Sequence, residues 1–435
     1  MTSGTGGIVA DSGGALEYAA SMEERKHHNH VGGTDAPSTA GFTFEVPASS
    51  GEVLGDWPRS GDEDLDPALE SALRVSDEWR ARSHMARVAT LHHGLEEIVK
   101  LRSLDEHFAD RLGLPGEHCV RYRRQAYRRG DAVLHRAPSV VPARGVALVH
   151  VDARAAVSGM VEELFLPLSN GMPVLLLSDP AMPFIADEVC AALESAGLPP
   201  GVLGVLHDDG LTVLRAALAR AEVTRAQVRG TPALIETARE VFDARPSGPG
   251  FADSPFGAGV PGGNNPVFDA RRLVDHTYLV RVGSDPDGAA EEVVRRAFGA
   301  EETWSGQAEG AVGRVLCHER VFSRFSEALL GTLDELTDDQ VGLPALDPEL
   351  WEEVAERISL GLDEGATLIH GDPAGSRRPK RDAILTPSVF TNAEPRMRLA
   401  RPGLPASVLV LMRCTDDAQA ATLADELDGE FANND

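Results

Sequence analysis

The residues best suited to chemistry lie in one glycine-rich loop. It reads Ser305-Gly306-Gln307-Ala308-Glu309-Gly310, and an apolar run, Val315-Leu316-Cys317, follows shortly after it. The carboxylate of Glu309 is of a type that acts as a general acid or base when its surroundings tune its pKa. It is a poor nucleophile toward a carbonyl, for which a thiolate is far better suited. The loop is therefore compatible with proton transfer, but it contains no thiol.

The cysteines of the chain offer no replacement for that thiol. Cys317 is the nearest in sequence, but its apolar surroundings predict a strand, and free cysteine is usually a small core residue. The four cysteines are widely separated and form no CxxC pair. This spacing predicts a reducing compartment without structural disulfides or zinc.

A histidine cluster near the N-terminus is the other group with metal-binding side chains. It comprises His27, His28 and His30. A solvated histidine cluster with no carboxylate or cysteine partner nearby holds a metal ion only weakly. We therefore expect no metal site.

Length and charge limit the partners of this protein. The chain of 435 residues exceeds one typical core and predicts two domains plus a tail. Its formal net charge of -27 opposes binding to DNA, RNA or an anionic membrane surface. The N-terminus has no basic start followed by an apolar run, and the longest apolar runs are strand-sized. We expect a cytoplasmic protein that binds neither nucleic acid nor membrane.

The elements that must position the loop follow an α/β pattern. Apolar runs of strand length alternate with amphipathic helices in the centre of the chain. The predicted strands are 146–149, 174–177 and 202–206, and the predicted helices between and after them are 184–196 and 211–220. Alternation at this spacing predicts a parallel sheet that is covered by helices on both faces.

Several motifs in this order resemble the aldehyde dehydrogenase superfamily. The glycine-rich loop, followed by an Arg-Val and a His-Glu, is similar to the family's nucleophile loop. Other matching segments are Leu168–Gly171, Ala196–Val202, Glu364–Ala366, Thr386–Thr391 and Met397–Arg401. The resemblance covers about residues 42–427.

The resemblance implies an α/β fold with two domains. A Rossmann-type parallel-sheet domain of the dinucleotide-binding kind is expected at 41–250, and a second α/β domain of the catalytic kind at 251–427. Residues 1–40 are rich in Gly, Ser and Thr without periodicity and are predicted to form a disordered tail, and 428–435 a short second tail. The stretch 270–288 is longer than the family pattern and has no assigned role.

Four functional side chains of the family are replaced. Glu309 stands at the position of the catalytic Cys, and Val260 at that of the general-base Glu. Leu176 replaces a Lys that meets the adenosine part of the cofactor, and Gly403 replaces a Glu that binds the nicotinamide ribose. These replacements together predict a degenerate family member that does not oxidise aldehydes with a nicotinamide cofactor.

Two further positions correspond to family binding groups. Gly230 and Thr231 match part of a turn that, in the family, lies beside the cofactor's pyrophosphate. An ordinary helix start has the same residues, so we interpret them as a vestigial cofactor-binding turn. Arg154 stands where the family has an oxyanion-binding Asn. We expect Glu309 and Arg154 to face one another, as an ion pair or around an anionic ligand. The alternative is an opened pocket in which both charges are solvated.

Three functions follow from this interpretation. The first is a binding or scaffold subunit, with no cofactor expected and with a second copy, an active aldehyde dehydrogenase or a pathway enzyme as its partner. The second is a repurposed enzyme in which Glu309 is the acid or base and Arg154 the anion site. The third is an NAD- or NADP-dependent aldehyde dehydrogenase whose catalytic residues lie elsewhere than this alignment places them. Fold similarity alone does not decide between them.

Overall fold

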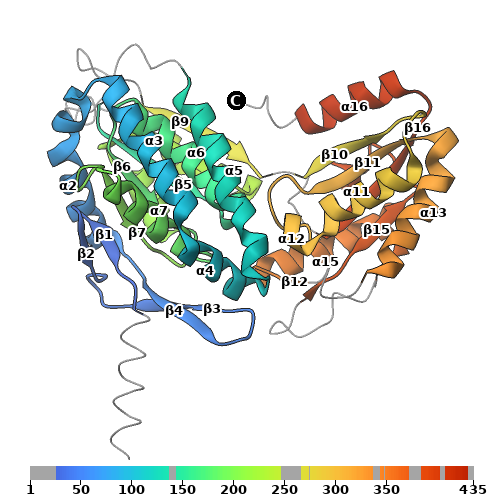
Figure 1. The fold of residues 1–435 in the computed structure, drawn as a ribbon, viewed down its shortest axis with the longest axis horizontal. Helices are drawn as coiled ribbons and strands as arrows, with labels where there is room; N and C mark the ends of the chain where they lie inside the picture. Colours follow the sequence, from blue (N-terminus) through green and yellow to red (C-terminus); the bar gives the residue numbers. More distant parts are fainter. Residues whose placement is uncertain are drawn as a thin grey trace, which may run out of the picture.

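The computed structural model describes residues 26–136, 144–245, 266–273, 275–336, 343–346, 348–371, 384–401 and 407–429. It contains two α/β lobes (Figure 1). The first lobe comprises the described residues up to 273, and the second lobe those from 275 onward. The chain passes from the first sheet to the second between β9 and β10.

The first lobe is built on a mainly parallel sheet. Within the described residues its strand order is β2 (Thr34–Ala36), β1 (Asn29–Val31), β7 (Leu203–Leu206), β6 (Val174–Leu177), β5 (Val146–Val151), β8 (Val223–Gly230) and β9 (Val267–Arg272). The strands from β7 to β9 run parallel, whereas β1 joins β7 antiparallel. The predicted strand at 174–177 is confirmed at both ends.

Helices cover both faces of this sheet. One face carries α2 (Asp62–Ala81), α8 (Thr212–Leu218) and α9 (Pro232–Asp243), and the other carries α3 (His84–Lys100), α4 (Arg102–Leu112), α5 (Gly116–Leu134), α6 (Ala156–Ser169) and α7 (Phe184–Ser195). The side chains of β5 alternate between the two cores. Ala147 and Val149 join one apolar cluster, and Val146 and Leu148 join the other. This two-sided burial explains why the strand has no polar face in the sequence.

The second lobe repeats the same layering around a smaller sheet. Its strand order within the described residues is β10 (His276–Val280), β11 (Val312–His318), β16 (Val408–Cys414), β15 (Ser388–Thr391) and β13 (Thr367–His370). The helices on one face are α11 (Pro286–Phe298) and α13 (Glu319–Glu335), and those on the other are α15 (Pro348–Asp363) and α16 (Asp417–Gly429). Short helix α12 (Ala300–Thr303) leads into the glycine-rich loop.

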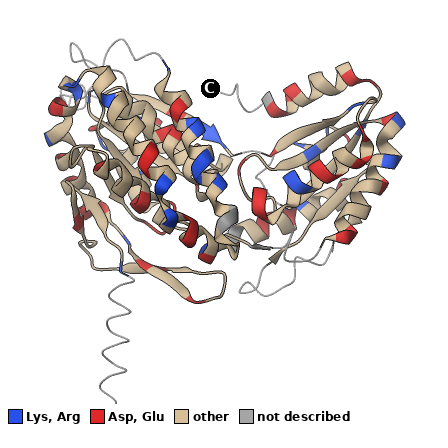
Figure 2. Cartoon of the chain, in the orientation of Figure 1, with Lys and Arg blue, Asp and Glu red and all other residues tan. Residues whose placement is uncertain are grey.

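Smaller elements complete the description. Strands β3 (Thr43–Pro47) and β4 (Val53–Pro58) form an antiparallel pair, as do β12 (Leu343–Pro344) and β14 (Ile384–Leu385). One-turn helices are η1 (Ala153–Ala155) and η4 (Arg398–Ala400). Acidic side chains lie on the helices of both lobes (Figure 2). No helix in the part of the chain that the structure describes is long and apolar enough to cross a bilayer.

The sheet topology corrects two of the predicted domain limits. Strands β1 and β2 fall inside the stretch that was predicted to be a disordered tail, because β1 extends the first sheet beside β7. The boundary predicted after residue 250 is also wrong. Strand β9 pairs with β8 in the first sheet and β10 with β11 in the second, so the boundary lies between Arg272 and His276. The stretch 270–288, which had no assigned role, therefore contains the crossing between the sheets.

Candidate functional site at the lobe interface

The glycine-rich loop is held in a strained conformation at the interface of the lobes. Trp304 and Ser305 both have positive φ angles, 51° and 56°, which are uncommon for residues other than glycine. The indole Nε1 of Trp304 donates to the hydroxyl of Tyr122 on α5. The side chain of Gln307 donates to the carbonyl of Trp304 at 2.9 Å and accepts the backbone N–H of Leu346 at 2.8 Å. The bond to Tyr122 ties the loop to the first lobe, whereas the bonds of Gln307 hold the loop itself and join it to Leu346 of the second lobe.

The carboxylate of Glu309 binds Arg229 at the end of β8. The Nη2 atom of Arg229 lies 2.8 Å from Oε1 and 2.9 Å from Oε2 of Glu309, and its Nε lies 3.2 Å from Oε1. The side chains are 6% and 14% exposed. A forked, charge-assisted contact of this kind is among the stronger hydrogen bonds in proteins. Because Glu309 belongs to the second lobe and Arg229 to the first, the pair ties the two lobes together.

More charges of the first lobe surround this pair. We use the name arginine–glutamate cluster for six residues: Arg129, Glu162, Glu163, Arg229, Arg271 and Glu309. The Nη1 atom of Arg229 donates to Glu162 at 3.0 Å and to Glu163 at 3.2 Å. Arg271 on β9 contacts the same two glutamates, and Arg129 on α5 lies 3.5 Å from Glu309. Glu309 is the one member of the cluster that comes from the second lobe.

The cluster shifts the pKa values of its members. Burial alone raises the pKa of Glu162, but hydrogen bonds from Arg271 and Arg229 more than offset it and lower the pKa to about 2. Burial dominates at Glu163, whose pKa is raised. Burial alone lowers the pKa of Arg229, but the charges of Glu309 and Glu163 raise it overall. Arg229 is therefore a permanent cation, and it cannot serve as a proton carrier.

The lowered pKa of Glu162 predicts how stability changes with acid. Its ordinary value is 4.5 and its folded value about 2, so its contribution is fully present above the ordinary value and is lost as the pH falls through the folded one. We expect the melting temperature of Glu162→Gln to fall less than that of the wild type between about pH 5 and pH 2. Thermal melts of both proteins across that range measure this. Parallel curves for the two proteins would contradict the assigned pKa.

Arg154 does not face Glu309, so that prediction is wrong. Its guanidinium forms a two-pronged bond to Asp152, with Nε 2.9 Å from Oδ1 and Nη2 2.9 Å from Oδ2. Asp152 also accepts the backbone N–H of Arg154, because η1 is a tight turn that brings residues two apart together. The two predicted positions do meet through the main chain: the N–H of Glu309 donates to the carbonyl of Arg154 at 2.9 Å. The side chains diverge to other partners.

The alternative of an opened pocket with solvated charges is contradicted as well. The side chains of Glu309 and Arg154 are 14% and 7% exposed, and both are paired. A cavity of about 550 Å³ does lie between the lobes. Its lining includes Arg121, Arg295 and Glu302, but neither Arg154 nor any member of the arginine–glutamate cluster.

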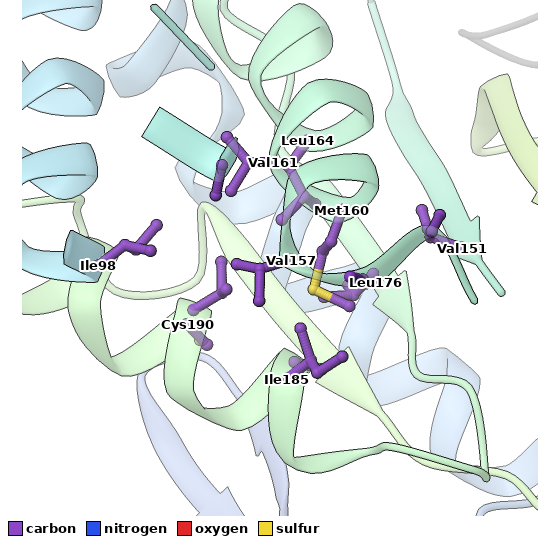
Figure 3. Close-up of a cluster of buried hydrophobic side chains, with 14 of the residues drawn as sticks. Ile98, Val151, Val157, Met160, Val161, Leu164, Leu176, Ile185 and Cys190 are labelled. Carbon is purple, nitrogen blue, oxygen red and sulfur yellow. The ribbon is translucent and has the colours of Figure 1, made fainter. Parts of the chain in front are cut away.

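The carboxyl ends of the parallel strands form the place where this class of sheet binds ligands. Leu176 on β6 is fully buried among apolar side chains such as Met160 and Ile185 (Figure 3). Asp179 follows β6, and burial together with the charge of Asp152 raises its pKa to about 7. The arginines at this edge, Arg154 and Arg229, are bound to Asp152 and Glu309 rather than directed at a pyrophosphate, and Asp179 adds a further carboxyl group there.

Gly230 and Thr231 form a helix start with local roles. The hydroxyl of Thr231 accepts the backbone N–H of Leu234 at 3.1 Å and so caps α9. Pro232 occupies the first turn and has no N–H to donate. A Cβ on Gly230 would meet the side chain of Leu234 at 2.4 Å. The residues present at this edge do not fit the phosphates of a dinucleotide cofactor.

The side chains of a serine, a histidine and an aspartate contact one another in series at the same edge. The hydroxyl of Ser178 lies 2.7 Å from Nδ1 of His207, whose Nε2 lies 2.9 Å from Asp187. Asp187 also accepts the indole N–H of Trp57. Ser178 is 2% exposed and His207 is fully buried, so a substrate cannot reach the hydroxyl. This series of side-chain contacts connects β4, α7 and the sheet rather than forming a hydrolytic site.

All four cysteines lie in the described part of the chain and are buried. Burial raises the pKa of Cys119 and of Cys317 to about 12 and also raises that of Cys190 and of Cys414. Cys317 lies in β11, as its apolar surroundings predicted. A catalytic thiol needs the opposite shift, toward the thiolate.

Comparisons with known proteins agree with this architecture. The sequence profile of the aldehyde dehydrogenase family matches residues 276–429. An α-ketoglutarate semialdehyde dehydrogenase from Haloferax volcanii is 24% identical over 92% of this chain and 83% of its own length. The chain is therefore similar to the aldehyde dehydrogenase superfamily over most of its length.

Further proteins of this superfamily match over similar lengths. A malonate-semialdehyde dehydrogenase from Halalkalibacterium halodurans is 25% identical over 94% of this chain and 84% of its own length. The crystal structure of an NAD-dependent benzaldehyde dehydrogenase from Corynebacterium glutamicum superposes with a TM-score of 0.76, covering 92% of this chain and 86% of that one at 18% identity. The predicted fold class, a Rossmann-type domain with a second α/β domain, is confirmed.

The sequence did not reveal the residues that surround Glu309. Arg229 directly precedes the turn predicted at Gly230 and Thr231, and neither it nor Glu162 and Glu163 is among the predicted site residues. A charged residue at the end of the buried strand β8, directly before Gly230, was the available signal, because a buried guanidinium requires a carboxylate partner. Val260 and Gly403 lie outside the described residues, so their two replacements remain predictions from the sequence.

Proposed function

We propose that this protein is an aldehyde dehydrogenase-fold binding subunit that has lost thiol-dependent aldehyde oxidation. One observation carries the proposal: the carboxylate at the position of the family nucleophile is bound on both oxygens by Arg229 and closes the lobe interface. Both oxygens of this carboxylate are therefore engaged by Arg229 rather than left free for a substrate. Glu309 then contributes to the structure of the interface rather than to chemistry.

The surroundings of the cofactor edge support the same proposal. Leu176 is buried in the sheet, Arg154 is bound to Asp152, and Asp179 adds a carboxyl group at the same edge. Thr231 caps its own helix. A binding subunit needs a partner, and we propose a second copy of this chain or an active member of the superfamily, because both share its fold.

A second candidate is an NAD- or NADP-dependent semialdehyde dehydrogenase. The names of the similar proteins favour it, since the relatives from Haloferax volcanii and Halalkalibacterium halodurans are both semialdehyde dehydrogenases. The repurposed enzyme that uses Glu309 with Arg154 has less support. Its two side chains are bound to Arg229 and Asp152 and do not converge on a common space.

Titration with cofactor distinguishes the first two candidates. We expect isothermal calorimetry with NAD+ and with NADP+ to give dissociation constants weaker than about 1 mM, because the arginines at this edge, Arg154 and Arg229, are already bound to carboxylates. The semialdehyde dehydrogenase from Haloferax volcanii, titrated under the same conditions, is the positive control. Micromolar binding of either nucleotide to this protein would favour the second candidate and count against ours.

A further inference from the structure

Three metal-binding side chains from distant parts of the chain meet at the edge of the first sheet. They are His30 on β1 and Cys190 and Glu194 on α7, and their ligand atoms all lie within 4.8 Å of one another. The histidine cluster gave no metal prediction because Cys190 and Glu194 lie far from it in the sequence. The fold supplies both. This group is separate from the arginine–glutamate cluster, and its argument does not depend on the proposed function.

The backbone holds the three side chains on regular elements. Cys190 and Glu194 are four residues apart on α7, so they lie on one face of the helix. His30 is fixed by the antiparallel pairing of β1, in which it stands opposite Val205 of β7. Sites built on helices and strands keep their geometry better than sites on loops. The three ligand atoms are therefore positioned before any ion arrives.

A fourth residue orients the imidazole in the way that metal sites require. The carboxylate of Asp35 on β2 lies 3.2 Å from Nδ1 of His30, while Nε2 of the same ring lies 2.8 Å from Glu194. A carboxylate on one ring nitrogen fixes the tautomer and leaves the other nitrogen for the ion. His30 thus presents Nε2 to the side where Glu194 and Cys190 lie.

The surroundings suit a partly open site. Cys190 lies against the apolar cluster of the first lobe, with Ile185 and Val157 nearby (Figure 3). The side chains of His30 and Glu194 are 17% and 25% exposed, so an ion has access from solvent. Imidazole, thiolate and carboxylate are all ligand types of Zn²⁺, which takes water in a fourth position when the protein supplies three ligands.

We propose that His30, Cys190 and Glu194 form a zinc-type metal site with Asp35 as the orienting carboxylate. The charges balance, because a dication binds one thiolate, one carboxylate and a neutral imidazole. Binding releases two protons to solvent: that of the Cys190 thiol and that of the His30 imidazole in its existing ion pair. Burial and nearby carboxylates raise the pKa of the Cys190 thiol in the absence of metal. A bound cation removes that proton directly, as it does from other coordinating thiols.

Cobalt substitution tests the site in the full chain. We expect Co²⁺, added to chelator-treated protein, to give the absorption bands of tetrahedral cobalt with a thiolate-to-cobalt charge-transfer band. Cys190→Ala should abolish the charge-transfer band, whereas Cys414→Ala, which removes another buried thiol, should leave it intact. Zn²⁺ should displace Co²⁺ and raise the melting temperature of the wild type.

Two variants outside the core keep the test decisive if Cys190→Ala does not fold. Asp35 is 75% exposed, so Asp35→Asn should fold and should weaken Zn²⁺ binding by about 10–100-fold. His28→Asn removes an exposed histidine of the same segment and should change nothing. A cobalt complex without a charge-transfer band, or equal Zn²⁺ affinity in the wild type and Asp35→Asn, would show that His30 and Glu194 form an ordinary ion pair.

Discussion

Replacing Arg229 by methionine should lower the free energy of unfolding by roughly 3–5 kcal/mol, the cost of breaking a buried ion pair. Arg229 binds Glu309, Glu162 and Glu163 at once, and its side chain is 6% exposed. Methionine keeps most of the volume but leaves those carboxylates with fewer cations in a place shielded from water. Denaturant unfolding followed by circular dichroism measures the change.

Arg129 supplies the matched control for this experiment. It also contacts Glu162 and Glu309, but at 3.4 Å and 3.5 Å and with a side chain that is 35% exposed. Arg129→Met should therefore cost no more than about 1 kcal/mol. A double variant, Arg229→Met with Glu309→Gln, should lose less than the sum of the two single losses, because the residues interact directly. Equal effects of Arg229→Met and Arg129→Met would contradict the central position of Arg229.

Much of the fold could be predicted because its signals are local. The alternation of apolar runs with amphipathic helices identified the strands at 146–149 and 174–177 and the helix at 184–196, and each is present with small differences at the ends. The strands that the sequence did not predict lie at the edge of the first sheet. Strands β1 and β2 are three residues each and gain their stability from the sheet beside them, so no periodicity marks them.

The candidate site could be predicted only in part. The resemblance placed the main chains of Arg154 and Glu309 together, and they are joined by a hydrogen bond. It did not give the direction of either side chain, because that direction depends on which opposite charge is nearest in space. Asp152 lies two residues from Arg154, whereas Arg229 reaches Glu309 from a strand 80 residues away. The pairing at His30 has the same origin, since its partners lie on α7.

The prediction with the largest expected effect concerns turnover. Active enzymes commonly convert about 1–1,000 substrate molecules per second, whereas this protein should form no NADH or NADPH from an aldehyde. The carboxylate at position 309 cannot form the thiohemiacetal from which hydride leaves, and none of the four buried cysteines has a lowered pKa. Glu309→Gln should therefore have the same rate as the wild type, which is that of buffer alone.

The most direct test of the central claim is the initial rate of NADH or NADPH formation with semialdehyde substrates. The semialdehyde dehydrogenase from Haloferax volcanii serves as the active control, and Glu309→Gln as the matched variant. We predict absorbance traces for the wild type and Glu309→Gln that coincide with the enzyme-free trace, while the control enzyme turns over. Steady cofactor reduction by the wild type that disappears in Glu309→Gln would contradict the account, because it would make Glu309 a catalytic residue.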